Sequence, residues 1–393
     1  MTDQRVDRRG LAPLYLAGFT TAFGAHGVAS VLGAGTDDIG LSLLGLGLVL
    51  ALYDVAEVIL KPFFGALSDR IGAKPVIVGG LVAFFLASLL ALVDASLLVL
   101  AVARFGQGAA ASAFSPASSA AVARLAGPER LGRYFGRYGA WKSVGYVLGP
   151  LLGIGLNHWL GIQAVYVALG ALAAAGGLWV AIAMPTLPVK PRPRYTLLDL
   201  VRQTTERGFL IPTLLLATTT AILGVATGFF PLLAVRLGLH PLAGAAAVAL
   251  LALTSAAMQP VVGRLRDQRR ITISSGSALG MLVATVGLVV LAVLPNATTL
   301  FAAAVAFGIT VSTVTPLAFA HLAASTPEER MGRTMGNAEL GRELGDAGGP
   351  LLVGGVAAAT TLPVALVVLA GVSALSGAVG WRGLRKHAAP TAR

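Results

Sequence analysis

The stretch GPERLGRYFGRYGAWKSVGYVLGPLLGIG at residues 127–155 is matched at residues 327–355 by PEERMGRTMGNAELGRELGDAGGPLLVGG. The positions that recur unchanged 200 residues later are Glu129, Arg130, Gly132, Arg133, Gly136, Gly145, Gly149, Pro150, Leu151, Leu152 and Gly155. Lys142 returns as Arg342, which keeps a cation at the same place. An offset of about half the 393-residue chain predicts an internal duplication, so that the protein is two copies of one unit.

Composition indicates the environment of that unit. Hydrophobic residues make up 56% of the chain and charged residues only 12%, about half the charged fraction of a soluble domain. The mean hydropathy is +0.82. The chain has no cysteine, which excludes disulfides, thiolate metal sites and cysteine nucleophiles. We therefore predict a membrane protein.

Apolar runs of about 20 residues, each long enough to cross about 30 Å of hydrocarbon, occur along the whole chain. They fall at 12–34, 41–63, 75–93, 97–123, 137–158, 161–184, 209–232, 241–262, 271–293, 298–324, 337–358 and 362–381. Two sets of six runs predict an all-α membrane protein with twelve transmembrane helices in two pseudo-symmetric halves. Parallel repeats of this kind are typical of transporters, whose substrate site lies between the halves.

The halves predict the domain organisation. We expect an N-terminal six-helix bundle at 1–184, a linker at 185–208 and a C-terminal six-helix bundle at 209–393. The prolines of the linker forbid a continuous helix, whereas TLLDLVRQTTER at 196–207 is suited to a short amphipathic helix on the membrane surface.

The positions of the basic residues predict the orientation. Cations cluster in alternate connections, beginning with the N-terminus, and the opposite connections carry only Arg236. The positive-inside rule then places both termini and the linker in the cytoplasm. This topology accounts for the net charge of +12, along with contact to anionic membrane lipid, so nucleic acid is not an expected partner.

Three short motifs lie on these elements. They are GALSDRIGAK at Gly65–Lys74, RFGQG at Arg104–Gly108, and the series Gly136, Gly145, Gly149, Pro150 and Gly153. In this order they resemble the G-x-L-x-D-R-x-G-x-[KR], R-x-x-Q-G and G-x8-G-x3-G-P-x2-G motifs of the major facilitator superfamily. The third motif marks the proton-coupled antiporters of that superfamily, especially its twelve-helix drug exporters.

The second copies depart from these patterns. Gly263-Arg-Leu-Arg-Asp267-Gln keeps the glycine, leucine and aspartate of the loop motif but lacks its later glycine. The repeated glycine series has Gly354 where an offset of 200 would put residue 353. The role of each second copy is therefore less certain than that of the first.

The motifs suggest two kinds of role. Gly145, Gly149 and Gly153 place bare backbone on one helix face, which tight packing alone would explain, while the resemblance implies a hinge. The resemblance also implies a cytoplasmic gate, in which Asp69 meets the start of the span at 337–358, near Gly336 and Asn337; a plain turn residue is the alternative. The gate motif consists of Gly65, Asp69, Arg70, Gly72 and Lys74.

Ionisable residues inside the spans are costly and therefore informative. They are Asp54, Glu57, Arg104, Lys142, Glu339, Arg342, Glu343, Asp346 and the titratable His26. Lys61 is discounted as a snorkelling residue, although Glu57 and Lys61 also form an i, i+4 pair. Because the resembled fold packs the second span against the eleventh, we expect Asp54 and Glu57 to pair with Arg342 across the domain interface.

Such a network would break when the cytoplasmic side opens, and a carboxylate that exchanges its counter-ion for a proton would couple opening to protonation. Whether Asp54, Glu57 or Asp346 carries the proton is left open. Glu339 and Glu343 either join the network or are solvated near the helix end. Arg104 either faces the central cavity, where it orients an anionic group or tunes a proton carrier, or makes a structural pairing within the N-terminal half. His26 either titrates in that cavity or is bonded to a helix backbone.

The remaining polar and aromatic residues of the cavity-lining spans predict the substrate class. The candidates are Thr20, Phe23, Gln107, Phe114, Ser115, Thr220, Thr227, Phe229, Phe307, Thr310, Thr313 and Phe319. They suit an amphipathic or cationic organic solute better than a polyanion, although single residues of this kind often serve packing only.

We therefore predict a proton-coupled exporter of a small drug-like compound, with proton-coupled nutrient uptake as the alternative. A membrane enzyme or receptor is disfavoured, because the chain lacks nucleotide-binding loops, metalloprotease spacing and a large cytoplasmic segment. We expect no cofactor and no metal, the proton gradient as the energy source, and a monomer. Few lysines, many arginines and abundant alanine and glycine suggest a bacterial cytoplasmic membrane.

Overall fold

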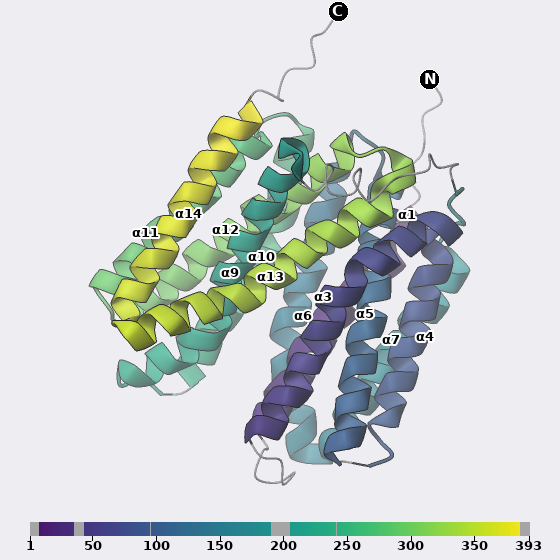
Figure 1. The fold of residues 1–393 in the computed structure, drawn as a ribbon, viewed down its shortest axis with the longest axis horizontal. Helices are drawn as coiled ribbons and strands as arrows, with labels where there is room; N and C mark the ends of the chain where they lie inside the picture. The colour runs from purple at the N-terminus through teal and green to yellow at the C-terminus, as the bar shows by residue number, and fades with distance from the viewer. Residues whose placement is uncertain (1–7, 35–42, 95, 190–204, 241, 386–393) are drawn as a thin grey trace, which may run out of the picture. The chain divides into compact units, whose positions relative to one another are not determined.

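The computed structural model describes residues 8–34, 43–94, 96–189, 205–240 and 242–385, and the described part of the chain is helical, with no strand (Figure 1). Its α-helices are α1 (Arg8–Ala34), α3 (Leu43–Ile71), α4 (Ala73–Leu90), α5 (Leu97–Ala126), α6 (Leu131–Leu160), α7 (Ile162–Ala183), α9 (Arg207–Arg236), α10 (Leu242–Asp267), α11 (Ile273–Val293), α12 (Ala297–Ser325), α13 (Met331–Ala359) and α14 (Leu362–Arg385). A 3-10 helix, η1 (Glu328–Arg330), precedes α13.

Each of the twelve predicted runs corresponds to one of these helices, which confirms the predicted fold class. Among the described residues, eight helices are long and apolar enough to cross a membrane: α4, α5, α7, α9, α10, α11, α12 and α14. Charged residues interrupt α3, α6 and α13. The helices outside this group are α1, α3, α6 and α13, and the last three carry most of the predicted ionisable residues, as expected if those residues face protein.

The turns after α3 and α10 show how the two copies of the loop motif differ. Gly72 has φ 98°, a conformation that favours glycine, and directly precedes α4. The second copy lacks this glycine, and there Arg269 takes φ 60° in the turn that leads to α11. The second turn therefore places a side chain in the left-handed region.

The chain folds into two compact units that interleave in sequence. Unit 1 consists of Met1–Pro128, Trp141–Arg192 and Thr326–Leu340, and unit 2 consists of Glu129–Ala140, Pro193–Ser325 and Gly341–Arg393. The first turns of α6 therefore belong to unit 2, and the first turns of α13 belong to unit 1. The predicted linker helix lies largely outside the described residues, which end at 189 and resume at 205.

The helices pair in the same pattern within each unit, as the duplication requires. In unit 1, α5 contacts α1, α3 and α4, while α7 contacts α1 and α4. In unit 2, α12 contacts α9, α10 and α11, while α14 contacts α9 and α11. Figure 1 shows the first set in purple to blue and the second in teal to yellow.

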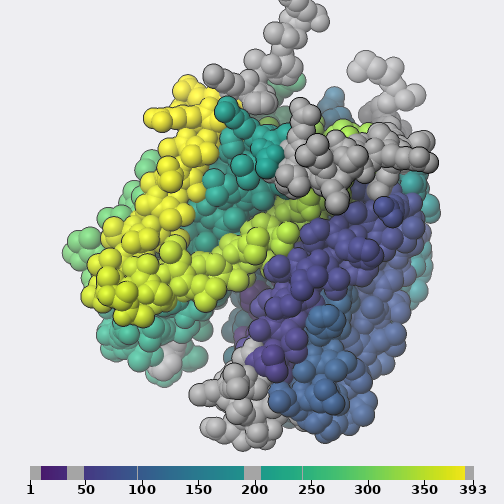
Figure 2. Space-filling view, viewed as in Figure 1, coloured from purple at the N-terminus to yellow at the C-terminus, as the bar shows by residue number. Residues whose placement is uncertain are grey.

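Large apolar side chains cover the outer faces of the helices. On α14, which is yellow at the surface in Figure 2, the exposed ones include Val364, Val367, Val368, Val372 and Leu375. Exposed apolar rows of this kind suit a helix that faces lipid.

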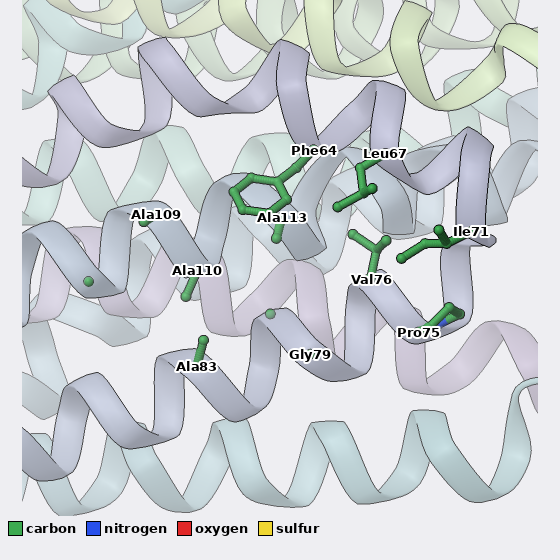
Figure 3. Close-up of a pocket in the computed structure, with 12 residues that line it drawn as sticks. Phe64, Leu67, Ile71, Pro75, Val76, Gly79, Ala83, Ala109, Ala110 and Ala113 are labelled. Carbon is green, nitrogen blue, oxygen red and sulfur yellow. The ribbon is translucent and has the colours of Figure 1, made fainter.

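Two apolar grooves open between helices within the units. The first has a volume of about 430 Å³ and lies among α3, α4 and α5, where Phe64 and Leu67 form one wall and glycines and alanines form the floor (Figure 3). The second, of about 360 Å³, lies between α11 and α12. None of the predicted substrate-contacting residues lines either groove.

Candidate functional site

The carboxylate of Asp69 holds the start of α13. Its oxygens accept hydrogen bonds from the backbone N–H groups of Gly332 and Arg333, at 2.6 and 2.9 Å. N–H groups in the first turn of a helix lack partners within the helix, and the helix dipole favours a negative charge there. We call this contact the Asp69 clamp. It lies one turn before Gly336 and Asn337, near which the family resemblance implied it.

Glycines let the two backbones approach each other beside this clamp. A Cβ on Gly336 would lie 2.7 Å from the carbonyl oxygen of Lys61 and a Cβ on Gly65 would lie 3.1 Å from the Cα of Gly336. Neither position accepts a larger residue without moving a helix. We call the contact of α3 with residues 331–340 of α13 the first crossing.

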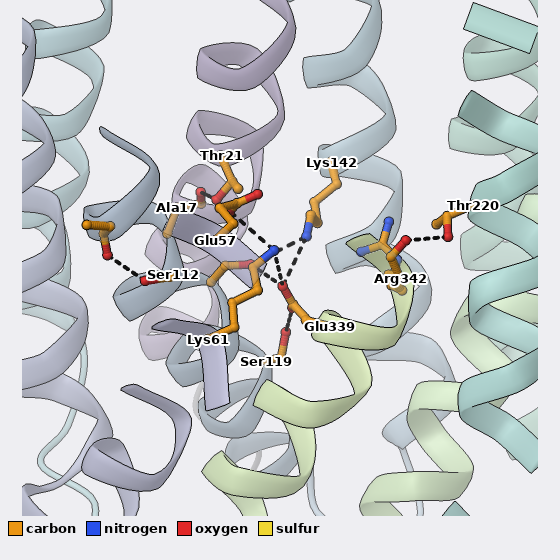
Figure 4. Close-up of polar contacts among 12 residues, drawn as sticks. Ala17, Thr21, Glu57, Lys61, Ser112, Ser119, Lys142, Thr220, Glu339 and Arg342 are labelled. Atoms are coloured by element: carbon orange, nitrogen blue, oxygen red, sulfur yellow. Dashed lines mark hydrogen bonds and ion pairs between the residues drawn. The ribbon is translucent and has the colours of Figure 1, made fainter. Parts of the chain in front are cut away.

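Four ionisable side chains meet about two turns away from the Asp69 clamp, toward the start of α3 and toward the end of α13. Glu339 Oε2 lies 3.8 Å from Lys61 Nζ and 3.8 Å from Lys142 Nζ, and Lys61 Nζ lies 3.2 Å from Glu57 Oε1 (Figure 4). The four side chains are between 1% and 9% exposed. We call Glu57, Lys61, Lys142 and Glu339 the ionic cluster. Its two acids and two bases balance in charge.

Hydroxyl groups of α5 complete the surroundings of Glu339. Ser115 donates to its Oε2 at 2.5 Å, and Ser119 donates to its Oε1 at 2.7 Å. These lengths are typical of a hydroxyl that donates to an ionised carboxylate. Lys142 Nζ lies 3.5 Å from the Ser115 hydroxyl. The cluster therefore joins α3, α5, α6 and α13.

The cluster corrects the interpretation of Lys61 and decides between the two alternatives for Glu339. Lys61 does not snorkel to the surface, because it is 1% exposed, and Glu339 is not solvated, because it is 0% exposed. Both residues lie near the end of a predicted span, where hydropathy alone gives solvent access. The close approach of α13 to α3 buries them instead.

A second clamp holds the start of α6. The carboxylate of Asp267 accepts hydrogen bonds from the N–H groups of Gly132 and Arg133, both at 2.8 Å. Arg266 Nη1 lies 3.3 Å from Asp267 Oδ1. We call this contact the Asp267 clamp, and the contact of α10 with residues 131–139 of α6 the second crossing. The incomplete copy of the loop motif thus forms the same contact as the complete one.

Three of the four members of the ionic cluster have uncharged counterparts at the second crossing, and the fourth, Lys142, corresponds to Arg342. Ser255 and Gln259 take the places of Glu57 and Lys61, 198 residues on, and the Gln259 amide donates to the Ser255 hydroxyl at 2.8 Å. Gly139 takes the place of Glu339. A side chain at position 139 would occupy the space that the Gln259 amide fills.

Arg342, the counterpart of Lys142, lies in unit 2. Its guanidinium stands 6.0 Å from the ring centre of Phe319, and its carbonyl accepts a hydrogen bond from Thr220 at 2.7 Å. Because Asp54 and Glu57 lie in unit 1, their pairing with Arg342 stays a prediction. Asp54 itself is exposed.

Three glycines of the series on α6 pack on α1, whereas Gly136 packs on the backbone of Gln259 in α10. A Cβ on Gly145 would lie 2.7 Å from the carbonyl oxygen of Phe19, and a Cβ on Gly153 would lie 2.9 Å from that of Gly27. At Gly149 the nearest backbone atoms belong to Phe23, at 3.0 Å, and to Gly27. The two backbones therefore touch over more than two turns, next to Pro150, whose ring removes a helix hydrogen bond.

The repeated series on α13 makes only part of this contact with α9. A Cβ on Gly345 or Gly349 would overlap the backbone of Ala217 or Ala221. The shifted Gly354 has only the ring of Phe229 near it, at 3.9 Å. The second copy therefore packs closely over its first turns and is open at the third.

Arg104 is fully buried in unit 1. Its Nη1 donates to the Gly24 carbonyl and to the Gln107 side chain, both at 3.3 Å, and its guanidinium lies 4.3 Å from the ring centre of Tyr53. Gln107 in turn donates to Ser88 at 3.0 Å. These contacts are the structural pairings within the N-terminal half that the sequence offered as one alternative.

The other predicted coupling residues are partly buried. The ring of His26 lies 4.4 Å from that of Tyr146, between α1 and α6. Glu343 is half-buried, and half-buried Asp346 lies beside Gly224 of α9. In the gate motif, Lys74 donates to the Met184 carbonyl at 2.7 Å, while Arg70 is exposed. A role in proton coupling stays a prediction for His26, Glu343 and Asp346, and a role in the gate stays a prediction for Arg70 and Lys74.

Most of the predicted cavity residues are packed within their own unit. Phe114 meets Phe84 edge-on at 5.9 Å, and Phe307 stacks on Phe230 at 5.7 Å. Thr310 donates to the Gly280 carbonyl at 2.9 Å. Buried in the same way are Thr20, Phe23, Gln107, Ser115, Thr220, Thr313 and Phe319, whereas Thr227 and Phe229 are half-buried. Contact of any of them with substrate stays a prediction.

Within the described residues, no group of three or more His, Asp or Glu side chains is placed to hold a metal ion.

Comparisons with known proteins place the chain in a family. The family model of the Major Facilitator Superfamily matches residues 14–285 and 214–393. A multidrug resistance protein B homolog of Mycobacterium tuberculosis is 37% identical over 124 residues, which are 31% of this chain and 23% of that protein. The quinolone resistance protein NorA of Staphylococcus aureus is 30% identical over 140 residues, 36% of each chain. The matched part is thus well under half of either relative.

Solved structures match over nearly the whole chain. The human organic anion transporter MFSD10 (TETRAN) has a TM-score of 0.79 at 18% identity, covering 96% of this chain and 100% of that one. The transporter FucP in its outward conformation has a TM-score of 0.81 at 15% identity, covering 98% and 100%. At these identities the likeness concerns the fold alone. With the family model matching across the chain, the protein belongs to the Major Facilitator Superfamily and is a membrane transporter rather than an enzyme.

Proposed function

We propose that the chain exports a small organic compound across the cytoplasmic membrane in exchange for protons, by alternating access. The packing of α6 on α1 carries the proposal. Gly145, Gly149 and Gly153 bring the two helices into backbone contact next to Pro150, and this series resembles the motif of proton-coupled antiporters. Two helices in such backbone contact can bend or slide against each other without repacking large side chains.

The two clamps supply the proposed gate. Each consists of one carboxylate and two backbone N–H groups at the start of a helix. These bonds are separable, because the carboxylate and the helix end can both be solvated once the crossing opens. In the proposed cycle, both clamps are closed when the cytoplasmic side is closed.

The substrate class rests on the relatives and on the predicted cavity residues. Two curated relatives are named for resistance to drugs. The predicted cavity residues are uncharged, and Phe23, Phe229 and Phe319 among them provide aromatic surface. An amphipathic or cationic compound fits such surroundings because aromatic faces attract cations and apolar groups.

The proposed orientation has both termini in the cytoplasm, as the basic connections indicate. Because the chain has no cysteine, one introduced cysteine at Glu206 reports its own side of the membrane. We expect a membrane-impermeant maleimide to label Glu206→Cys in inverted vesicles and not in intact cells. Labelling in intact cells alone would reverse the orientation.

Transport by vesicles tests the function. Inverted vesicles that contain the chain should accumulate ethidium when a pH gradient, acidic inside, is imposed. The accumulation should disappear when an ionophore collapses the gradient. It should also disappear in the variant Gly149→Val, whose side chain prevents the close contact of α6 with α1.

A different pattern would contradict antiport. If a panel of cationic dyes and common antibiotics shows no gradient-dependent accumulation in inverted vesicles, while an inward proton gradient drives solute entry into right-side-out vesicles, the chain is a symporter.

A further inference from the structure

The duplication provides an internal control for finding the proton-sensitive group. Both crossings have an acid-to-helix clamp, but the ionic cluster occurs only at the first. At the positions that correspond to Glu57, Lys61 and Glu339 the second copy has Ser255, Gln259 and Gly139, none of which titrates, while Lys142 corresponds to the buried cation Arg342. A proton can therefore act differently on the two copies through this cluster.

Glu339 is the member of the cluster that joins α13 to three other helices. Its carboxylate contacts Lys61 of α3, Lys142 of α6 and the two serines of α5. The acid of α3 that shares this cluster is Glu57, which faces Lys61. On α13 itself, Arg342 and Glu343 follow Glu339 at i+3 and i+4.

Protonation of Glu339 changes both the hydrogen bonds and the charge balance. Its Oε2 faces one hydroxyl donor and two ammonium groups, so a proton on that oxygen would meet three donors. Of the two carboxylates in the cluster, Glu57 alone would then remain ionised beside Lys61 and Lys142. Two ammonium groups that shared one carboxylate oxygen would repel each other in a buried site.

We propose that Glu339 is the proton-coupling carboxylate, and that its protonation releases residues 331–340 of α13 from α3. This inference rests on the proposed function and names the group that the sequence left open. While Glu339 is ionised, the cluster holds the first crossing closed beside the Asp69 clamp. When Glu339 is neutral, the two lysines separate and the crossing opens.

Opening of the first crossing on protonation of Glu339 is the direction that antiport requires. A proton that reaches Glu339 while the cytoplasmic side is closed favours opening to the cytoplasm. There the exposed carboxylate loses its proton, and the crossing can close again once the exported compound is bound. One proton site that is filled in one state and emptied in the other exchanges protons for substrate.

A distance measurement tests the proposal without any transported compound. Ile71 and Glu328 are both exposed and lie on the two sides of the first crossing. With spin labels at Ile71→Cys and Glu328→Cys in the full chain, in nanodiscs, acidification from about pH 8 to about pH 5 should shift the distance distribution to longer values. The added Glu339→Gln should give the long distances at both pH values.

Two further variants keep the result interpretable. Glu329→Gln makes the same chemical change at a half-buried position in η1, and should follow the parent's pH response. Should Glu339→Gln fail to fold, the triple variant Glu57→Ser, Lys61→Gln, Glu339→Gly reproduces the residues of the second crossing and should also lose the response. A parent without any pH response, or a Glu339→Gln variant that retains it, would overturn the proposal while leaving the vesicle test of export untouched.

Discussion

The first and second crossings have the same backbone contact but different chemistry at their centres. In both, an aspartate accepts two N–H bonds at a helix start, and glycines let the backbones touch. Two turns further, the first crossing buries Glu57, Lys61 and Glu339, whereas the second buries Ser255 and Gln259. Backbone geometry is thus shared by the two copies, and the buried side chains distinguish them.

Under our proposal, this difference lets a duplicated scaffold respond to protons at only one of its two crossings. A crossing without a carboxylate at the position of Glu339 contributes packing and hydrogen bonds that change little with pH. An ionic crossing adds groups whose burial is tolerated only while the charges balance. We therefore expect the two crossings to open and close in a similar way, but pH should affect the first crossing more strongly than the second.

The largest expected effect on stability is at Glu339. Glu339→Leu leaves Lys61 and Lys142 buried with too little negative charge, which should lower the free energy of unfolding by about 3–5 kcal/mol. At the corresponding position, Gly139→Ala displaces the Gln259 amide and should cost only about 1 kcal/mol. Equilibrium unfolding in mixed detergent and SDS micelles measures both. Equal losses would mean that the charges of the first crossing do not stabilise it.

We expect the Asp69 clamp and the Asp267 clamp to lose similar stability when the aspartate is mutated. Asp69→Asn and Asp267→Asn each keep the shape of the side chain but replace one charged acceptor oxygen by an amide group. Each should lower the free energy of unfolding by about 1.5 kcal/mol, within about 0.5 kcal/mol of the other. The same unfolding assay compares them, with Glu329→Gln as a control change from acid to amide at a half-buried position. A much larger loss for one aspartate would show that the two clamps are not equivalent.

The smallest expected effects are on the glycine series, and they differ in sign. Gly153→Ala places a methyl group against the Gly27 carbonyl and should destabilise the protein by about 1 kcal/mol. Gly354→Ala meets only a distant ring and should stabilise α13 by about 0.5 kcal/mol, since alanine favours a helix. Destabilisation by both variants would indicate that the open third turn on α13 closes against another element.

The sequence predicted the twelve helices and the duplication because both depend on long-range patterns of hydropathy and glycine. The family resemblance placed the contact of Asp69 within one turn of where it lies. The i, i+4 pair of Glu57 and Lys61 was also predictable, because one helix contains both residues.

The ionic cluster could not be predicted, because it depends on which helix faces meet. Lys61 and Glu339 lie near span ends, where hydropathy suggests solvent, and their burial follows from the close approach of α3 and α13. The role of Gln259 depends on the missing side chain of Gly139, a relation between residues 120 positions apart. The repeat offset is the signal that could have aligned these positions in advance.

The most direct test of the account replaces the centre of the ionic crossing with that of the neutral one. Wild-type chain and the variant Glu57→Ser, Lys61→Gln, Glu339→Gly would be compared in liposomes for two activities. These are exchange of ethidium at equal pH and accumulation of ethidium driven by a pH gradient. We predict that the variant retains exchange but loses accumulation by about tenfold or more, because only the proton link is removed. Accumulation at the wild-type level in the variant would contradict the assignment of proton coupling to the first crossing.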